Sequence, residues 1–443
     1  MKQIKSAYEL SQSQVATPPC VVKLFWQLTH SHRQRFQTVL DLGAGDGRFA
    51  TGGNFAKYVG IEIDRRRLSG AKLPKHGQVL TGCAFEHSEG SYDACVGNPP
   101  YVRHHDIEAP WKSKIVDRIK ADLEVTLNKK CNLYLYFVCL GLLKTKDNGL
   151  LSFVVPFEWV SRPSAEPVRA LIRRHGWGVN VYRFRTSIFP SVLTTASITV
   201  VDKSITTGRW SFFDIDEDQK VTPRRGIVDH PAGPLKYGLR GQLWAMRGMS
   251  PGSQRLFCLT EGERIHHGLR PQDVIPCVTT LREVPHGVTQ LTQPVFRRHF
   301  VRAGARCWLV KCHSKRCSKV VRTYLDSIQP AEHDNYTCNS REPWYRYAVH
   351  PIPRLLVSSG FTGTGPKVLL NCLGAHAVGA VTGIHGDRRF ASRQLHKHLV
   401  GLALNKLVVP HAKSLKKIEV RQLNTVLNDY VHEATQNAGH GSR

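Results

Sequence analysis

The chain has 443 residues, and its 62 Lys and Arg against 34 Asp and Glu give a formal net charge of +28. An excess this large favours a polyanionic partner, which points to nucleic acid. The longest apolar run, residues 133–143, is far short of the roughly 20 residues that a bilayer requires, so we expect no membrane association. At about 150 residues per domain, the length predicts two or three domains.

The twelve cysteines are scattered rather than arranged as a paired framework. A chain of this length does not need disulfides to hold its core, so we expect reduced thiols and an intracellular, cytoplasmic protein. Residues 1–10 lack the apolar segment of a secretion signal, in agreement with that expectation. Cys307, Cys312 and Cys317 recur at intervals of five with His313 among them, but ordinary zinc modules are spaced differently. We therefore expect no metal site.

Short apolar segments alternate with helical stretches between residues 38 and 203, and this predicts an α/β domain with a mostly parallel, seven-stranded sheet. The segment 132–144 is apolar almost all round, which predicts a buried helix. Residues 165–175 predict a second helix, ended by Gly176. The expected strands are 38–42, 58–63, 78–81, 92–97, 150–155, 179–184 and 196–201.

The pattern changes after residue 203, and this gives the expected domain boundaries. Residues 1–203 would form the first domain, and residues 204–255, rich in turn formers and charges, a linker region. Residues 256–430 carry many Arg, Lys, His and aromatic residues in short mixed segments, which predicts a basic domain of mixed α+β structure. Residues 431–443 would be a disordered tail.

The segment TVLDLGAGDGRFA, residues 38–50, combines a strand, a glycine-rich turn and the start of a helix. Gly43 and Gly45 allow a tight turn that leaves backbone amides open toward a ligand. The turn lacks the Gly-Lys-Ser/Thr of a phosphate-binding loop. Such a turn alone is also compatible with a plain strand-to-helix connection, so its neighbours decide the interpretation.

Three carboxylates near this turn indicate the kind of cofactor. Glu62 ends the next strand, 21 residues after Asp41, where a carboxylate can accept both ribose hydroxyls of a nucleoside-type cofactor. Asp41 and Asp46 would repel a pyrophosphate but attract the α-ammonium of a methionine moiety. The sequence therefore predicts S-adenosylmethionine rather than a dinucleotide.

The expected strand 92–97 leads into Asn98-Pro99-Pro100-Tyr101, at the sheet edge where open α/β folds bind ligands. The exocyclic amine of adenine is a poor nucleophile because its lone pair is delocalised into the ring. The side-chain oxygen of Asn98 and the carbonyl of Pro99 could accept its two hydrogens and localise that lone pair, while Pro100 stiffens the turn. Tyr101 would stack on a base outside the duplex. A plain turn is the alternative interpretation.

With these motifs the chain resembles the gamma-class, TaqI-like N6-adenine DNA methyltransferases of restriction-modification systems. The resemblance covers roughly residues 13–203, and it implies a Rossmann-like catalytic domain followed by a target-recognition domain. The segments that carry it are ATPPCVVKLF (16–25), DLGAGDG, GIEID, GNPPY, NLYLYFVCLGLLK (132–144), GLLSFVVPFEW and RTSIFPSVLTTASITVV (185–201).

The resemblance implies S-adenosylmethionine as cofactor and duplex DNA as substrate, with the glycine loop, Glu62 and the Asn-Pro-Pro-Tyr motif in the roles given above. It adds two residues. Thr17 would contact the methionine end of the cofactor, and Phe189 would stack on the flipped adenine beside Tyr101. Core packing at the edge of the sheet is the alternative for Phe189.

One position departs from the family pattern. The family usually has an Asp after the third strand, in contact with the adenine amine of the cofactor. Counting back sixteen residues from Asn98 gives Gly82, and the next acidic residue is Glu86. The cofactor adenine would then be held by backbone and apolar groups, or held more weakly.

The segment REPWYRYAVHPIPRLLVSSGF, residues 341–361, resembles a segment in the recognition half of related methyltransferases. It alternates arginines, which can reach phosphates or guanine edges, with aromatic residues that can stack or wedge. Basic clusters at 294–302, 385–390 and 411–421 are better explained as solvated or phosphate-contacting faces than as base readers. The expected DNA-binding residues are Arg341, Trp344, Tyr345, Arg346 and Arg354.

Two other functions remain open from the sequence. HemK-like enzymes use the same Asn-Pro-Pro-Tyr motif on a glutamine amide, and others act on RNA adenine, but a long basic extension after the catalytic domain favours DNA. A DNA-binding module with a decayed catalytic fold is the non-enzymatic alternative. We expect a bacterial or archaeal methylase, associated with the nucleoid through DNA, that acts as a monomer. Any cognate restriction endonuclease would be encoded separately, because no convincing nuclease site is found.

Overall fold

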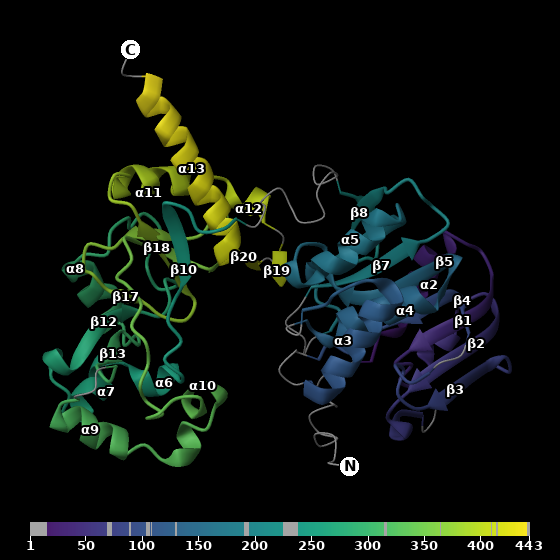
Figure 1. Ribbon diagram of the computed structural model, residues 1–443, viewed down its shortest axis with the longest axis horizontal. Helices are drawn as coiled ribbons and strands as arrows, with labels where there is room; N and C mark the ends of the chain where they lie inside the picture. The colour runs from purple at the N-terminus through teal and green to yellow at the C-terminus, as the bar shows by residue number, and fades with distance from the viewer. Residues whose placement is uncertain are drawn as a thin grey trace. The chain divides into compact units, whose positions relative to one another are not determined.

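The computed structural model describes residues 16–68, 73–87, 90–102, 107, 109–128, 131–189, 195–224, 238–313, 317–363, 365–408, 410–412 and 415–440. The chain divides into two compact units (Figure 1). The amino-terminal unit comprises residues 1–233 with 410–414, and the carboxyl-terminal unit comprises residues 234–409 with 415–443. None of the described helices combines the length and the apolar character needed to cross a membrane.

A nine-stranded sheet in the order β3-β2-β1-β4-β5-β7-β6-β8-β9 forms the centre of the amino-terminal unit. Strands β1 to β5 are mutually parallel, β7 is antiparallel to both its neighbours, and β8 is parallel to β6. The strands are β1 (Phe36–Leu42), β2 (Phe55–Glu62), β3 (Gly77–Thr81), β4 (Tyr92–Gly97), β5 (Thr145–Pro156), β6 (Gly178–Phe184), β7 (Ala196–Asp202), β8 (Trp210–Ile215) and β9 (Val221–Pro223).

The order of the strands places a topological switch point between β1 and β4. Strand β1 pairs with β2 on one side and with β4 on the other, so the connections that follow β1 and β4 diverge at their carboxyl ends. Open α/β sheets bind their ligands in the crevice at such a point. The expected mostly parallel α/β fold is therefore confirmed, together with all seven expected strands.

Helices α2 and α4 cover opposite faces of this sheet. On β5, Val154 packs with α2, whereas Phe153 lies against Gly141 of α4, because successive side chains of a strand point to opposite faces. As expected, α4 is buried almost all round. The helical segments are α2 (Pro19–His30), α3 (Ala109–Leu123), α4 (Leu133–Lys144), α5 (Glu166–Arg174), and the 3-10 turns η1 (Arg48–Ala50), η2 (Arg65–Leu68), η4 (Phe157–Val160) and η5 (Pro163–Ala165).

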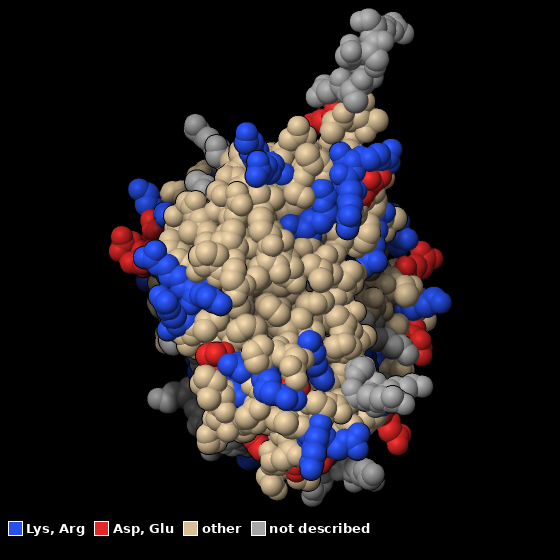
Figure 2. All heavy atoms as spheres, turned by 90° about the vertical axis from the view of Figure 1, so that its left-hand side faces the viewer, with Lys and Arg blue, Asp and Glu red and all other residues tan. Residues whose placement is uncertain are grey.

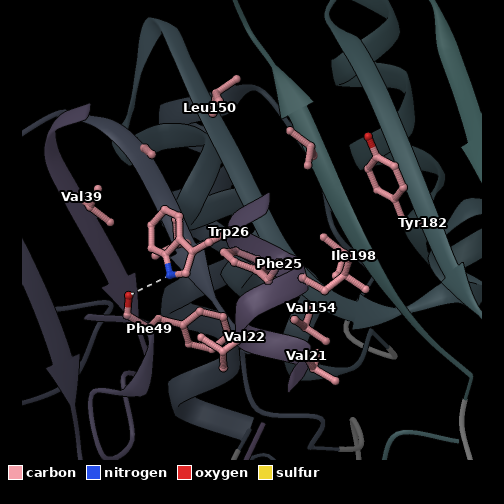
Figure 3. Packing of buried hydrophobic residues seen from close by; sticks show 14 of the residues in the cluster. Val21, Val22, Phe25, Trp26, Val39, Phe49, Leu150, Val154, Tyr182 and Ile198 are labelled. Atoms are coloured by element: carbon pink, nitrogen blue, oxygen red, sulfur yellow. Dashed lines mark hydrogen bonds between the residues drawn. The ribbon is translucent and has the colours of Figure 1, made fainter. Parts of the chain in front are cut away.

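Helix α2 is fixed on the sheet by aromatic packing and by two polar contacts, of which Figure 3 shows the hydrogen bond of Trp26. Phe25 and Trp26 are buried among apolar side chains of the strands. The indole Nε1 of Trp26 donates to the carbonyl of Phe49 over 3.2 Å, and the hydroxyls of Thr29 and Ser152 lie 2.7 Å apart. These contacts fix the start of α2, and with it the residues just before Pro19.

The expected linker and tail differ from the structure. Strands β8 and β9 lie within residues 204–255 and extend the sheet from seven strands to nine, so the amino-terminal unit continues beyond residue 203. In β8, Trp210, Phe212 and Ile215 are buried, but this short apolar run stands between polar, turn-forming segments, so the sequence pattern does not reveal the strand. Helix α13 (Val420–His440) includes most of the expected tail.

The carboxyl-terminal unit contains short strands and helices, which agrees with the expected mixed α+β structure. One sheet has the order β10-β18-β14-β16, and a second has the order β11-β13-β12-β17. The strands of this unit are β10 (Leu243–Arg247), β11 (Cys258–Leu259), β12 (Val274–Val278), β13 (Trp308–Val310), β14 (Leu355–Ser358), β15 (Gly360–Phe361), β16 (Val368–Leu370), β17 (His376–Ala377), β18 (Val381–Gly386) and β20 (Leu415–Lys417). Strand β19 (Pro410–Ala412) belongs to the amino-terminal unit.

One core of this unit lies where the first sheet meets two helices. Leu243 and Ile384 of the sheet pack with Leu395 of α11 and Leu427 of α13, and all four side chains are buried. The helical segments are α6 (Gln254–Phe257), α7 (Glu261–His266), η6 (Pro271–Asp273), α8 (Gln293–Phe296), the π-helical turn η7 (Arg297–Val301), α9 (Lys319–Asp326), η8 (Pro330–Glu332), α10 (Tyr336–Asn339), α11 (Ser392–Gly401), α12 (Leu404–Leu407) and α13.

Candidate active site

Three polar side chains lie at the carboxyl ends of neighbouring strands at the switch point. Asp41 is the penultimate residue of β1, Glu62 ends β2, and Asn98 directly follows β4. In the sheet, Asp41 stands opposite Gly60 of β2 and Val96 of β4. The expected cofactor residues and the expected catalytic asparagine are therefore brought together at one edge of the sheet.

The glycine loop between β1 and η1 makes the tight turn expected from its sequence. Gly43, Gly45 and Gly47 have φ angles of 82°, 59° and 74°, a region in which residues with a side chain are strained. The amides of Gly43 and Ala44 both donate to the carbonyl of Ile61 over 2.9 Å, which ties the loop to β2. The loop leads into the 3-10 turn η1 instead of the α-helix that its sequence suggested.

The Glu62 carboxylate is held by two backbone amides. Its Oε2 accepts from the amide of Gly45 over 2.7 Å, and its Oε1 accepts from the amide of Asp64 over 2.9 Å. Only 3% of the residue is exposed. Each carboxylate oxygen can accept more than one hydrogen bond, so this fixed group retains capacity for a pair of ligand hydroxyls.

Asp41 is a fully buried carboxyl group with one satisfied oxygen. The phenol of Tyr58 donates to its Oδ2 over 2.6 Å, whereas Oδ1 has no hydrogen-bond partner among the described residues. Burial raises the pKa of Asp41 to about 7, against the effect of the Tyr58 hydrogen bond, and the negative charges of Glu62 and Asp46 add to the increase. The unsatisfied oxygen is suited to a cationic group such as an ammonium.

Gly97 gives Asp41 the space that it occupies. A Cβ atom at Gly97 would overlap with Oδ1 of Asp41, and the φ angle of Gly97 is 132°. Both observations require glycine at the end of β4. Neither Tyr58 nor this requirement was foreseen from the sequence, although the inward position of Tyr58 on a buried strand is consistent with the period of two in β-strands.

Asp46 is paired within the loop, which differs from its expected role. Nε of Arg48 donates to its Oδ1 over 2.8 Å, and Nη2 of Arg48 donates to its Oδ2. This forked pair lowers the pKa of Asp46. Its charge is therefore compensated by a cation two residues away, and of the two loop acids only Asp41 has an oxygen without a partner among the described residues.

The side chain of Asn98 contacts Thr17. Its Nδ2 donates to Oγ1 of Thr17 over 3.1 Å, and Thr17 is only 2% exposed. The carbonyl of Thr17 in turn accepts from Nη1 of Arg48. Thr17 was expected to contact the methionine end of the cofactor, but in this structure it lies against the catalytic motif. Arg48 was not among the residues expected from the sequence to contribute to the site.

Tyr101 and Phe189 lie close to each other, as the resemblance implied, but their rings are not parallel. Their ring centroids are 6.3 Å apart at an interplanar angle of 81°, an edge-to-face contact. Phe189 is 2% exposed and belongs to the core on the α2 face, which corresponds to the alternative interpretation from the sequence. The phenol of Tyr101 donates to the carbonyl of Val154 over 3.0 Å.

Gly82 lies at the end of β3, where its amide donates to the carbonyl of Glu62 over 2.9 Å. A Cβ atom at this position would meet no other atom within 4 Å. An acidic side chain would therefore have fitted here, and no steric reason accounts for the glycine. Glu86, the nearest acid in the sequence, is exposed.

Two of the arginines expected to bind DNA are used to hold the carboxyl-terminal unit together. Arg341 donates from Nη1 to the carbonyl of Pro251 over 2.6 Å and from Nη2 to the carbonyl of Ser250 over 3.1 Å. Arg354 donates from Nε to Oγ of Ser392 over 3.1 Å. Its Nη1 and Nη2 donate to the carbonyls of Asp387 and Phe390, respectively. Their guanidinium groups connect loops.

The aromatic residues of the same segment are partly buried. Trp344 stacks on His333 with ring centroids 3.9 Å apart, and it meets Phe257 edge-on. Tyr345 packs against the same core, and its carbonyl accepts from the thiol of Cys312. The alternation of arginine and aromatic residues thus builds the interior of this unit. Arg346 is half-buried, and its Nε has no hydrogen-bond partner among the described residues.

Basic side chains elsewhere on this unit are exposed. Arg297, Arg298 and Arg302 lie on and just after the π-helical turn η7, in the basic cluster 294–302. On the face drawn in Figure 2, Lys and Arg side chains gather in several groups with fewer acidic side chains between them. Among the described residues, no three His, Cys, Asp or Glu side chains are grouped so that they could hold a metal ion.

Two family models match the chain. Residues 55–189 match the Eco57I restriction-modification methylase, and residues 244–409 match the C-terminal domain of the Type II methyltransferase M.Eco57I. Each model covers less than half of the chain, and together they match parts of both of its halves. The resemblance to restriction-modification DNA methyltransferases noted from the sequence motifs is thereby confirmed as a similarity.

Curated relatives match this chain over part of their length. It is 26% identical over 310 residues to the Type II methyltransferase M.XamI of Xanthomonas campestris pv. amaranthicola, which covers 61% of the chain and 57% of the relative. It is 28% identical over 156 residues to M.AccI of Acinetobacter calcoaceticus, which covers 34% of the chain and 28% of the relative. The matched parts therefore span little more than half of the first relative and less of the second.

A solved structure supports the fold over almost the whole chain. The Type IIL restriction-modification enzyme MmeI, solved in complex with DNA, aligns with a TM-score of 0.58 at 10% identity over 94% of this chain and 64% of that chain. This likeness shows the fold. The match to the Eco57I methylase model supports S-adenosylmethionine as the cofactor, which the unsatisfied oxygen of Asp41 and the fixed carboxylate of Glu62 fit.

Proposed function

We propose that this protein is a site-specific DNA methyltransferase that transfers a methyl group from S-adenosylmethionine to the N6 amine of a flipped adenine in duplex DNA. The observation that carries the proposal is the position of Asn98. Its amide lies at the carboxyl end of β4, at the same switch point as the carboxyl groups of Asp41 and Glu62. A hydrogen-bonding group for a target amine thus stands beside a cofactor site.

Asn98 and Pro99 would prepare the nucleophile. The side-chain oxygen of Asn98 and the backbone carbonyl of Pro99 accept the two hydrogens of the amine, which localises the nitrogen lone pair for direct attack. Both acceptors are preorganised, because Pro100 stiffens the turn and Thr17 holds the Asn98 amide. When bound, S-adenosylmethionine supplies an electrophilic methyl group, so the protein itself need not form a covalent intermediate.

Asp41, Glu62 and the glycine loop would hold the cofactor. The unsatisfied Oδ1 of Asp41 would accept from the α-ammonium of the methionine moiety, and Glu62 would accept from the ribose hydroxyls. Gly43 and Gly45 would let the backbone approach it closely. The open space at Gly82 leaves the adenine of the cofactor without the acidic contact of related enzymes.

Tyr101 and Phe189 would receive the flipped base. Their edge-to-face contact leaves no parallel slot between the rings, so the base would stack on Tyr101 after Phe189 has moved or turned. Extruding a base from the duplex requires unstacking it, and a stacking surface in the pocket offsets part of that free energy.

The carboxyl-terminal unit would recognise the DNA target, and the net charge of +28 supports a polyanionic partner. Exposed Arg297, Arg298 and Arg302 would contact phosphates, whereas Arg341 and Arg354 would act indirectly by holding the unit together. Among the residues expected from the sequence, Arg346 is the remaining candidate for a direct contact. We further propose a monomer that acts alongside a separately encoded endonuclease.

The proposal is tested by incubating the purified protein with methyl-labelled S-adenosylmethionine and unmodified duplex DNA of high sequence diversity. Hydrolysis of the DNA to nucleosides should then give labelled N6-methyl-2′-deoxyadenosine. Parallel reactions contain RNA or a protein extract in place of the DNA. Label in N4-methylcytosine would change the target base, and label confined to RNA or protein would overturn the proposal.

A further inference from the structure

A hydrogen bond between residues 81 positions apart joins Thr17 to the catalytic motif. Nδ2 of Asn98 donates to Oγ1 of Thr17 over 3.1 Å, and Thr17 is buried with 2% of its surface exposed. A hydroxyl group in such a place has little access to solvent. It therefore acts on the groups that surround it, and the Asn98 amide is the side chain that it contacts.

Besides its contact with Asn98, Thr17 is fixed by the helix that follows it in the chain. After it, Pro18 and Pro19 begin α2, and the amides of Val21 and Val22 donate to the carbonyl of Pro18 over 2.9 Å and 3.1 Å. Helix α2 is in turn fixed on the sheet by Trp26 and by the pair Thr29 and Ser152, as described above (Figure 3). A displacement of Thr17 would thus require the helix to move.

Arg48 fixes Thr17 from a third side. Its Nη1 donates to the carbonyl of Thr17, while Nε and Nη2 hold the carboxylate of Asp46 in the glycine loop. A planar guanidinium group presents donors in a fixed fork, so this one side chain sets the distance between the loop and Thr17. A continuous chain of contacts then runs from Asp46 through Arg48 and Thr17 to Asn98.

The orientation of the Asn98 amide decides whether it can act. An amide has an acceptor at one end and two donors at the other, and only the oxygen can accept a hydrogen from the target amine. With Nδ2 directed at Thr17, the oxygen is at the end of the amide that points away from Thr17. The reverse orientation would direct N–H groups at the N–H groups of the substrate.

We propose that Thr17 is a positioning residue for methyl transfer, which holds the Asn98 amide in place through the hydrogen bond between Asn98 Nδ2 and the Thr17 hydroxyl. Arg48 supports it by holding the Thr17 backbone against the glycine loop. This inference rests on the proposed function, and it differs from the expectation that Thr17 contacts the methionine end of the cofactor.

The test compares Thr17→Val, which keeps the shape but removes the hydroxyl, with Thr17→Ser, which keeps the hydroxyl. Single-turnover methyl transfer is measured on DNA at saturating S-adenosylmethionine, and cofactor affinity is measured separately by calorimetry. We expect Thr17→Val to slow transfer by about 10- to 100-fold, because a misplaced catalytic group has an effect of this order. The affinity should change by less than about 3-fold, and Thr17→Ser should restore most of the rate.

A second comparison tests whether Thr17 acts through the Asn98 amide. In an Asn98→Ala background no amide remains for Thr17 to hold. Adding Thr17→Val to Asn98→Ala should therefore change the residual rate by no more than about 3-fold, although it acts strongly in the wild type. An equal loss in both backgrounds would overturn the inference, because Thr17 would then act independently of the amide.

Other results separate this inference from the proposed function. If the wild type methylates DNA and Thr17→Val does so equally fast, or loses only cofactor affinity, the inference fails and the proposed function stands. If the wild type transfers no methyl group to DNA, the proposed function itself fails. Should valine not be tolerated at residue 17, the unfolding temperature reveals it, and Thr17→Ala compared with Thr17→Ser answers the same question.

Discussion

The phenol of Tyr58, on β2, donates a 2.6 Å hydrogen bond to Oδ2 of Asp41 near the end of β1, and both side chains are fully buried. This contact satisfies one carboxyl oxygen and leaves the other without a partner among the described residues. Because burial raises the pKa of Asp41 to about 7, the group is partly protonated near neutral pH. Its charge can therefore respond to a bound cation.

Cofactor binding should release protons. An ammonium beside Asp41 stabilises the ionised carboxylate, so binding lowers its pKa and displaces a proton wherever the free protein carries one. We expect the affinity for S-adenosylmethionine to rise from pH 6 to pH 8 and the Asp41→Asn variant to lose this dependence. Calorimetry in two buffers of different ionisation enthalpy measures the released protons. Equal binding enthalpies in the two buffers at pH 6.5 would contradict this role of Asp41.

The same carboxyl group should make stability depend on pH. The pKa of Asp41 is about 7 in the folded chain and 3.8 without burial, so the folded state binds the proton more tightly. Stability is then lost as the pH rises from 3.8 toward 7, because the unfolded chain releases the proton first. Relative to Asp41→Asn, the wild type should lose about 3 kcal/mol of unfolding free energy between pH 5 and pH 8. Urea unfolding of both proteins at the two pH values measures the difference.

Replacing Glu62 should weaken cofactor binding. Glu62→Ala removes the acceptor of the amides of Gly45 and Asp64 and the proposed ribose contact, and charge-assisted hydrogen bonds of this kind contribute about 1.5–3 kcal/mol. We expect an affinity for S-adenosylmethionine about 10- to 100-fold lower, with an intermediate loss for Glu62→Gln. Glu217→Ala, in the exposed turn between β8 and β9, is the matched control. Unchanged affinity in Glu62→Ala would exclude the ribose role.

Replacing Arg354 should affect the stability of the carboxyl-terminal unit, whereas replacing Arg298 should affect its DNA binding. Arg354→Ala removes three hydrogen bonds between loops and should destabilise this unit by about 2–4 kcal/mol. Arg298→Ala, on the exposed turn η7, should leave the unfolding temperature unchanged and reduce the salt slope of DNA binding by about 1. Thermal unfolding and DNA affinity at several salt concentrations distinguish the two. A reduced salt slope in a stable Arg354→Ala protein would place that residue on the DNA instead.

The sequence predicted those parts of the site that depend on local pattern. The strand before Gly43, the strand ended by Glu62 and the strand before Asn98 each show a short apolar run followed by a polar motif, and in a parallel sheet such ends meet. Strand β8 was missed, because a single short run with Trp210 and Ile215 stands between polar segments. Its pairing with β6 is a long-range property that no local pattern reports.

The roles of individual side chains were less predictable. Asp46 was expected to attract the cofactor, but Arg48 stands close enough to pair with it, and such a choice between solvent, ligand and neighbour depends on three-dimensional distances. Arg341 and Trp344 show the same limit in the carboxyl-terminal unit. An alternation of arginine and aromatic residues suits both a DNA surface and a loop-rich interior, and only the burial of the residues separates the two.

The most direct test of the account is single-turnover methyl transfer by Asn98→Ala beside the wild type, with cofactor affinity measured on both proteins. Asn98 is proposed to activate the target amine as a nucleophile and not to bind the cofactor. The account therefore predicts a loss of transfer of about 1,000-fold or more with cofactor affinity within about 3-fold of the wild type. Transfer to adenine at the wild-type rate in Asn98→Ala would contradict it.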